Sequence, residues 1–120
     1  MAKAVAAGVD VRVEVEGDRR PLPPGVDRAA FRIAQEALTN VVRHASGATA
    51  TVRVAYGDDA VTLQVDDDGN GTPAKDASGS GNGITGMRER ASALGGRFDA
   101  GPRAGGGFRV RAWLPLGDRQ

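Results

Sequence analysis

Glu36, Asn40 and Arg43, in the first half of the sequence, are spaced so that a helix would place them on one face. Asn40 follows Glu36 by four residues and precedes Arg43 by three. On a helix these three side chains fall within about 60° of one another, with Arg32 and His44 at the edges of the group. A carboxylate, a carboxamide and a guanidinium placed side by side can hold a hydrated cation together with an anionic ligand. A solvated outer helix face is the plainer interpretation of the same stripe.

The remaining positions of this segment predict an amphipathic helix that packs on a core. Apolar residues recur at the spacing of one helix face. The predicted core residues are Phe31, Ala34, Leu38, Val41 and Ala45. Asp27 is a suitable N-cap for this helix, and Ser46-Gly47 is expected to end it. The polar group is therefore predicted to face away from the core.

A second candidate site is the acidic, glycine-containing hexapeptide Asp66-Asp67-Asp68-Gly69-Asn70-Gly71. It directly follows a predicted strand that ends at Val65. Turns favour Asp, Asn and Gly, so an exposed structural turn is one interpretation. The functional alternative is that one aspartate points into the fold and accepts a hydrogen bond from a ligand amine. The flanking glycines would then let a flat ring lie against the backbone.

The third candidate is the segment from Gly81 to Gly86, which matches the pattern Gly-x-Gly-x-x-Gly. A dinucleotide-binding fold requires this pattern directly after a strand, and here a polar loop precedes it. The sequence also lacks the Gly-x-x-x-x-Gly-Lys-Ser/Thr pattern of Walker-type loops. Glycines that lead into a helix nevertheless expose backbone N–H groups at its positive end, which suits phosphate groups.

The elements that must position these residues follow from hydrophobic periodicity. Alternating apolar residues predict strands at 9–15, 50–56, 61–65 and 108–114, with a short strand at 97–100. Residues 84–94 predict a second helix, ended by Gly95-Gly96. The resulting order predicts an α/β two-layer sandwich, with a mixed, mostly antiparallel sheet and helices on one face.

Composition narrows the functional classes. A chain of 120 residues suits a single domain. Its net charge is +1, and its arginines are scattered among acidic residues, which argues against nucleic acid or a membrane surface as the principal partner. The absence of cysteine and the single histidine exclude thiolate chemistry and a histidine metal cage. No apolar run approaches the roughly 18 residues needed to span a bilayer, and the start lacks the features of a signal peptide. A cytoplasmic location is expected.

Taken together, the three segments resemble the ATP-binding catalytic domains of sensor histidine kinases. The first helix resembles their N box, Asp67-x-Gly69-x-Gly71 their G1 box, and Gly81-x-Gly83 with 87–90 their G2 box, while 105–107 stands where the last glycine motif falls. The residues at 35–40 and 86–90 are similar to the corresponding sequences of the nitrate-sensor-like subfamily. The resemblance covers about residues 9–115 and implies the Bergerat fold of the gyrase, heat-shock protein 90 and mismatch-repair ATPases, the GHKL superfamily.

The resemblance also implies roles for individual residues. Asp67 would accept from the adenine amine, Asn40 would ligate Mg²⁺ beside the phosphates of ATP, and Glu36 would act as a base or hold a metal-bound water. The other implied nucleotide contacts are Arg43, His44, Gly69, Gly71, Gly81, Gly83, Ile84 and Met87. Residues 72–82 would form a lid over the triphosphate. Phe108 departs from the family, which commonly carries threonine there, and a core role is expected for it.

The implied function is that of a single catalytic domain spanning 1–120, which binds Mg-ATP and donates the γ-phosphoryl group to a histidine on a separate helical dimerisation domain. A response regulator would act downstream, and the full-length protein could carry a membrane anchor. His44 is followed by Ala45-Ser46 rather than by an acid, so it is not expected to be the acceptor. The dimerisation and sensor domains are expected to lie outside residues 1–120. The alternatives are an anti-sigma-factor serine kinase of the same superfamily and a nucleotide-binding interaction module.

Overall fold

The computed structural model describes residues 2–6, 9–18, 21–44, 49–69, 81–104 and 106–116, with side chains from residue 10 onward except at 42–44 and 81–83. The elements, in chain order, are β1 (Ala2–Ala6), β2 (Val9–Glu16), α1 (Pro24–His44), β3 (Thr49–Tyr56), β4 (Ala60–Asp67), α3 (Gly81–Ala93), β5 (Arg97–Pro102) and β6 (Phe108–Pro115). Every predicted element is present. The additional strand β1 was not predicted.

The strands form one mixed sheet in the order β1-β2-β3-β4-β6-β5. β2 and β3 are parallel, with Val13 opposite Val52, and α1 is the crossover between them. The other adjacent pairs are antiparallel, including the predicted hairpin of β3 and β4, in which Val52 lies opposite Val65. The prediction of a mixed, mostly antiparallel sheet is therefore confirmed.

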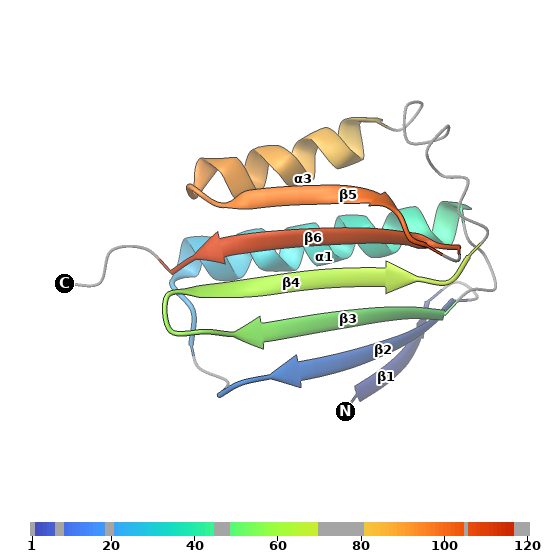
Figure 1. Ribbon diagram of the computed structural model, residues 1–120, viewed down its shortest axis with the longest axis horizontal. Helices are drawn as coiled ribbons and strands as arrows, with labels where there is room; N and C mark the ends of the chain where they lie inside the picture. Colours follow the sequence, from blue (N-terminus) through green and yellow to red (C-terminus); the bar gives the residue numbers. More distant parts are fainter. Residues whose placement is uncertain are drawn as a thin grey trace.

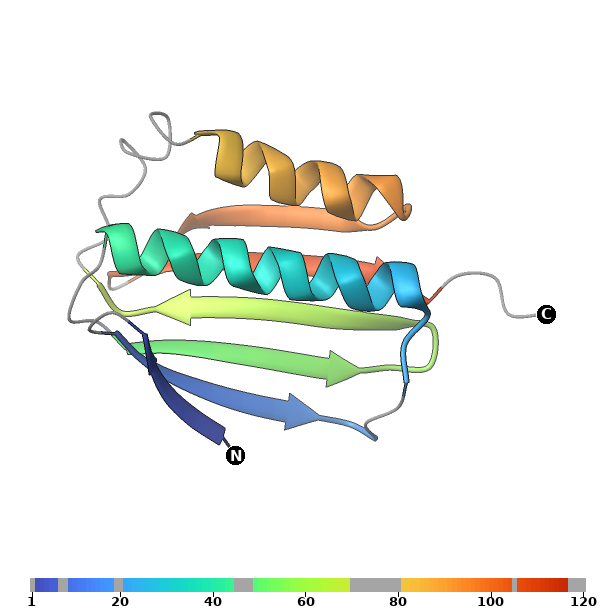
Figure 2. The same ribbon diagram turned by 180° about the vertical axis from the view of Figure 1, so that it is seen from behind.

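Both helices lie on the same face of the sheet, as the two opposite views show (Figures 1 and 2). α1 packs over β4 and β6, while α3 packs beside α1 and over β5. The core between the layers consists of small and medium apolar side chains: Val11, Val26, Ala29, Ile33, Ala37, Val41, Ala50, Val52, Val61, Leu63, Val65, Met87, Ala91, Val110, Ala112, Leu114 and Leu116. Neither described helix covers the other face of the sheet.

The core-facing side of α1 differs from the predicted one. Ile33 is completely buried, whereas Phe31 is 64% exposed. At about 100° per residue, Phe31 lies roughly 160° around the helix from Ile33. The buried positions are Val26, Ala29, Ile33, Ala37 and Val41, with Ala34 and Leu38 only partly buried. Packing on β4 and β6 therefore selects the stripe through Ile33, and the prediction that Phe31 faces the core is wrong.

The start of α1 also differs from the prediction, whereas the end of α3 agrees with it. α1 begins at Pro24, and the N–H of Asp27 donates to the Pro23 carbonyl at 2.9 Å, so Asp27 lies in the first turn rather than at the N-cap. Proline is well suited to the first helical position because its missing N–H would lack a helical partner there. Gly95, at φ 78°, ends α3, and the Gly96 N–H donates to the Ala91 carbonyl at 2.8 Å.

The corrected orientation of α1 predicts a large difference between two nearby substitutions. Ile33→Ala should lower the free energy of unfolding by about 2–5 kcal/mol, because it opens a cavity in the core. Phe31→Ala should change it by less than about 0.5 kcal/mol, because a mostly exposed side chain loses little packing. Urea denaturation of both variants tests this, and a larger loss for Phe31→Ala would contradict the orientation seen here.

Candidate nucleotide-binding site

The predicted site residues collect at one end of the fold. The C-terminal ends of β4 and α1, the start of α3 and the β5–β6 connection all lie at the same end of the molecule, on the right in Figure 1 and on the left in Figure 2. Because β4 and β6 are antiparallel, the end of β4 lies beside the start of β6. α1 connects β2 to β3, and its C-terminal end lies at this same end of the sheet. Segments far apart in the sequence therefore meet around the end of β4.

The structure gives the three consecutive aspartates three different environments. Asp66 faces the open side of the sheet, where it accepts from Arg109 Nε at 2.8 Å and from Gln64 Nε2 at 2.9 Å. Asp68 accepts from the Thr49 N–H at 2.7 Å and ties the end of β4 to the start of β3. Asp67 continues the buried alternation of β4 and lies on the helix-covered side. Strand geometry sends Asp67 to the face opposite Asp66. Asp66 and Asp68 are held by different partners.

Asp67 is the buried charged residue of this region, at 6% exposed. Its Oδ1 accepts from the Gly69 N–H at 2.9 Å. Burial raises the pKa of Asp67 above its ordinary range, and the nearby Asp68 raises it further, whereas N–H donors of Gly69 and Phe108 and the charge of Arg103 lower it. A buried carboxylate that retains acceptor capacity suits a ligand amine, as the sequence predicted.

The pKa of Asp66 moves the other way. Burial opposes its charged form, but hydrogen bonds from Arg109 and Gln64 outweigh burial and hold the pKa of Asp66 below its usual value. Adjacent aspartates on opposite faces of one strand thus have pKa shifts of opposite sign.

This contrast predicts opposite pH dependences of stability. The stabilising contribution of Asp67, whose pKa is raised on folding, is complete below its unfolded pKa of about 4 and is lost as pH rises through the folded pKa. That of Asp66, whose pKa is lowered, is present above about pH 4 and is lost as pH falls through the folded pKa. Relative to wild type, ligand-free Asp67→Asn should therefore become more stable as pH rises from about 4 toward 7. Asp66→Asn should be less stable than wild type above about pH 4, and this deficit should shrink as pH falls below about 4. Urea denaturation at pH values below and above 4 measures both trends, and a deficit of Asp66→Asn that grows as pH falls would contradict the assignment.

Asn40 carries the clearest sign of a missing partner. Its Oδ1 is buried and finds no hydrogen-bond partner in the structure described here. Seven residues separate it from Ile33, which places it about 20° from Ile33 around α1. Around the helix, Asn40 therefore lies between Ala29 and Ile33, within the buried stripe, and the prediction that it faces away from the core is wrong. An unpaired buried carbonyl oxygen costs about 1–3 kcal/mol, so a water, an ion or a ligand that donates to or coordinates it would be stabilising.

Glu36 lies one turn before Asn40, about 60° from Ile33 around the helix, and is half-buried. It borders the core on the same side as Asn40, so the two side chains keep their predicted proximity. Arg43 and His44 occupy the last turn of α1. Their side chains lie outside the described residues, so their predicted phosphate contacts remain predictions.

The glycine motif opens α3, whose first residues are Gly81 and Gly83. Backbone N–H groups of this first turn are the donors predicted to meet phosphates. Ile84 is half-buried against the core, and Met87 is completely buried within it. Met87 thus contributes packing in this structure, and a direct nucleotide contact by its side chain remains a prediction. Gly71 and residues 72–80 of the lid predicted at 72–82 lie outside the described residues.

The connection between β5 and β6 contributes Arg103, which sequence reasoning did not assign, and Gly107, which belongs to the predicted last glycine motif. Arg103 Nη1 donates to the Asp67 carbonyl at 2.7 Å. Gly107, at φ 94°, packs so closely on the same carbonyl that a Cβ there would collide with it. The triple-glycine run at 105–107 was the sequence signal for this close approach. Phe108 lies opposite Asp67 and packs partly buried against the core, which confirms its predicted role.

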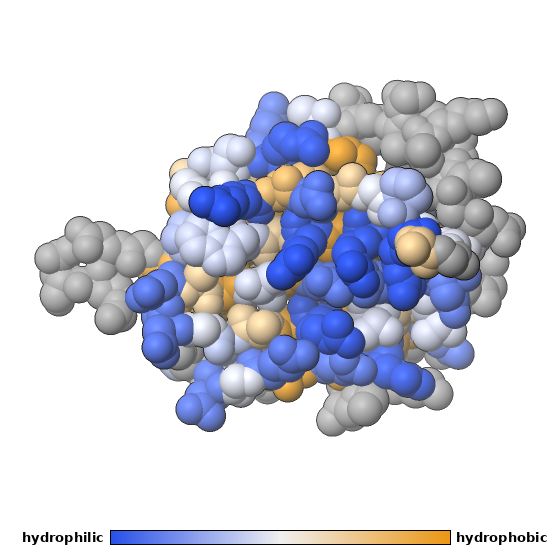
Figure 3. All heavy atoms as spheres, viewed as in Figure 1, coloured by the Kyte–Doolittle hydropathy of each residue, from blue (hydrophilic) through white to orange (hydrophobic). Residues whose placement is uncertain are grey.

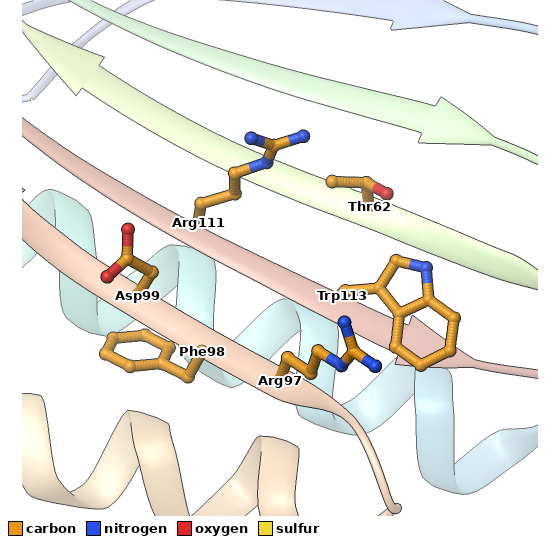
Figure 4. Close-up of a pocket in the computed structure, with 6 residues that line it drawn as sticks. All are labelled: Thr62, Arg97, Phe98, Asp99, Arg111 and Trp113. Carbon is orange, nitrogen blue, oxygen red and sulfur yellow. The ribbon is translucent and has the colours of Figure 1, made fainter.

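The open face of the sheet is largely hydrophilic (Figure 3). Its polar groups are partly paired, as in the ion pair of Arg53 with Glu14 at 2.9 Å. A shallow hollow of about 430 Å³ lies there beside Trp113, and Arg97 reaches over the Trp113 ring at 5.6 Å from its centroid (Figure 4). This hollow lies on the opposite face of the sheet from Asp67, so it is separate from the predicted site.

Two further features bear on ligands and location. Among the described side chains, no three His, Cys, Asp or Glu residues gather closely enough to hold a metal ion by themselves. Neither described helix is long and apolar enough to cross a lipid bilayer.

Comparisons with known proteins agree with this geometry. Residues 25–118 match the family described as histidine kinase-, DNA gyrase B-, and HSP90-like ATPase. The chain is 32% identical over 114 residues to the sensor histidine kinase LnrJ of Bacillus subtilis, covering 95% of this chain and 28% of that protein. It is 34% identical over 95 residues to the sensor protein VraS of Staphylococcus aureus, covering 79% of this chain and 27% of that protein.

Solved structures show the same fold. The histidine kinase domain of the Erythrobacter litoralis EL346 blue-light activated histidine kinase superposes with a TM-score of 0.70 at 26% identity, covering 88% of this chain and 52% of that one. The catalytic domain of the histidine kinase ThkA superposes with a TM-score of 0.72 at 14% identity, covering 92% of this chain and 80% of that one. The chain has the fold of histidine kinase catalytic domains, and it belongs to the family of histidine kinase-, gyrase B- and HSP90-like ATPases. It spans little more than a quarter of the length of the two sensor proteins.

Proposed function

We propose that this chain is the ATP-binding catalytic domain of a sensor histidine kinase, and that it donates the γ-phosphoryl group of ATP to a histidine on a separate helical domain. Two observations at one end of a fold of this family carry the proposal: Asp67 is buried, and the Asn40 oxygen has no partner among the described residues. Asp67 supplies an acceptor for the adenine amine, and Asn40 supplies a polar atom that lacks a partner without ligand. A response regulator would receive the phosphoryl group in turn.

The nucleotide would span the end of the sheet. Asp67 and Gly69 would bind the adenine, while the N–H groups at the start of α3, from Gly81 to Ile84, would face the phosphates. Phosphate binding at a helix N-terminus uses both the free N–H donors and the helix dipole. Arg43 and His44, in the last turn of α1, would add positive charge or hydrogen bonds beside the phosphates.

Mg²⁺ fits the donors of this site. Asn40 presents an amide oxygen without a partner, and amide and carboxylate oxygens are the protein ligands that Mg²⁺ accepts. Such sites usually take one or two protein ligands and complete the coordination with phosphates and water. Asn40 would be the direct ligand and Glu36 a holder of metal-bound water. When bound, Mg²⁺ would neutralise charge on the β- and γ-phosphates during transfer.

Asn40→Leu tests this assignment through both stability and binding. The variant removes an unpaired buried oxygen at similar volume, so the ligand-free chain should keep its stability or gain up to about 1 kcal/mol. It should also lose the enhancement of ATP affinity by Mg²⁺, which we expect to be about fivefold in wild type, equivalent to roughly 1 kcal/mol. Calorimetric titration with and without Mg²⁺, together with urea denaturation, measures both quantities.

The exposed Gln35, on the same helix, provides the matched control. Gln35→Leu should leave the Mg²⁺ enhancement unchanged. A strongly destabilised Asn40→Leu that still responds to Mg²⁺ would show that Asn40 is a structural residue rather than a metal ligand.

The alternative functions predict other substrates for the same fold. An anti-sigma-factor kinase would transfer phosphate to a serine of an antagonist protein, and an interaction module would transfer none. Of the two similar proteins named above, one is a sensor histidine kinase and the other a sensor protein, which favours the histidine kinase. Incubating the chain with labelled ATP and the dimerisation domain of a similar sensor kinase should produce acid-labile phosphohistidine. Tight ATP binding without any such transfer would argue for the alternatives.

A further inference from the structure

The loop that joins β5 to β6 has a well-defined geometry next to Asp67. The Arg103 N–H donates to the Gly107 carbonyl at 2.9 Å, and the Gly106 N–H donates to the Arg103 carbonyl at 3.1 Å. Gly106 and Gly107 adopt φ values of 114° and 94°, which residues with a side chain rarely adopt. These hydrogen bonds close a tight turn that begins at Arg103 and restrain the Arg103 backbone.

From this position the side chain of Arg103 extends to the end of β4. Its Nη1 donates to the Asp67 carbonyl at 2.7 Å, and the guanidinium is half-buried. Gly107 packs on the same carbonyl, where any Cβ would collide. On the other side of Asp67, the Gly69 N–H holds the carboxylate at 2.9 Å. The peptide and the carboxylate of Asp67 are therefore restrained from two directions.

We propose that Arg103 is a positioning residue for adenine recognition, which fixes the Asp67 peptide so that the carboxylate keeps the orientation that binds the adenine amine. The inference rests on the proposed function, since it assigns to Arg103 an effect on the same nucleotide. A charged hydrogen bond to a carbonyl is stronger than a neutral one, and a planar guanidinium fixes its direction better than an ammonium does. Arginine is therefore better suited than lysine to this position.

Charge gives Arg103 a second effect on Asp67. Among the described residues, the charged groups that act on Asp67 are Asp68, which raises its pKa, and Arg103, which lowers it. Removal of the arginine charge should raise the pKa of Asp67 further. Because adenine recognition requires the ionised carboxylate, ATP binding should then weaken at a higher pH than in wild type.

The test compares Arg103→Met with Arg109→Met, using ATP itself as the probe. Arg109 lies on the same hairpin but pairs with Asp66 on the open face, so it is a matched control. ATP affinity, measured by calorimetry between pH 5 and 8, should fall about tenfold near neutral pH in Arg103→Met. Its decline on the acid side should also move to higher pH. Arg109→Met should match wild type in both respects.

Arg103→Lys separates position from charge. It should keep the wild-type pH dependence and recover only part of the affinity, because the ammonium retains the charge without the planar donor geometry. If Arg103→Met does not fold, Arg103→Gln, which keeps an N–H donor without charge, serves for the same pH comparison. An unchanged affinity, or a lowered affinity with an unshifted acid limb, would overturn the inference while leaving the proposed function intact. Failure of wild type to bind ATP would overturn both.

Discussion

Asp67→Asn should lower the affinity of the chain for ATP by roughly ten- to a hundredfold, because it replaces a charged acceptor for the adenine amine by a neutral amide. A hydrogen bond to a charged group contributes about 1.5–3 kcal/mol, which corresponds to this range of affinity. Asp67 is 6% exposed, so water cannot readily take the place of the lost interaction. Calorimetric titration with Mg-ATP measures the effect.

The neighbouring Asp66→Asn is the matched control. It removes the same charge one residue earlier, but from the open face of the sheet, where Asp66 pairs with Arg109. We expect its ATP affinity to stay within about twofold of wild type, since rim charges that do not touch a ligand contribute little. Equal ATP affinity of wild type and Asp67→Asn would refute the role assigned to Asp67. Equal losses in both variants would instead indicate a long-range effect of charge.

The strands were the most predictable part of this fold. Val61, Leu63 and Val65 alternate with polar residues, and each is buried in the structure. The period of a strand fixes which face each residue occupies, so the pattern determines both element and orientation. β1 gave no such signal, because Ala2–Ala6 consists mainly of small residues. It forms by pairing with β2, where Ala4 lies opposite Val11, and this is a tertiary contact.

The orientation of α1 could not be decided from its sequence. Its many alanines leave two apolar stripes, one through Phe31 and one through Ile33, and both include Val41. The sequence prediction placed the first stripe on the core. In the structure, α1 packs on β4, β6 and α3 with the second stripe, so Ile33 is buried and Phe31 is exposed. The same orientation places Asn40 on the buried side of α1.

The sequence motifs predicted the candidate site residues, but not the hydrogen bonds from other segments that hold them in place. The motif pointed to Asp67, yet the separate partners of Asp66 and Asp68 depend on strand pairing. The hydrogen bond from Arg103 to the Asp67 carbonyl joins residues 36 positions apart. No local pattern encodes such a contact, so only the assembled sheet shows it.

Glu36→Gln should separate binding from phosphoryl transfer. Glu36 is half-buried one turn before Asn40, at the edge of the buried stripe of α1. Glutamine preserves its size and one acceptor oxygen but can neither take up a proton nor hold water as a carboxylate does. We therefore expect ATP affinity within about twofold of wild type. Transfer to a supplied acceptor domain should slow by on the order of a hundredfold, as typically follows the loss of a general base.

Glu89, exposed on the outer side of α3, is the control for this experiment. Glu89→Gln removes the same charge from the same chain and should leave both binding and transfer unchanged. Single-turnover transfer with saturating ATP isolates the chemical step from nucleotide binding. If Glu36→Gln folds normally but no longer binds ATP, Glu36 belongs to the binding site. If transfer proceeds at the wild-type rate, the chemical step requires no carboxylate at this position, and electrostatic stabilisation around the phosphates must account for the rate.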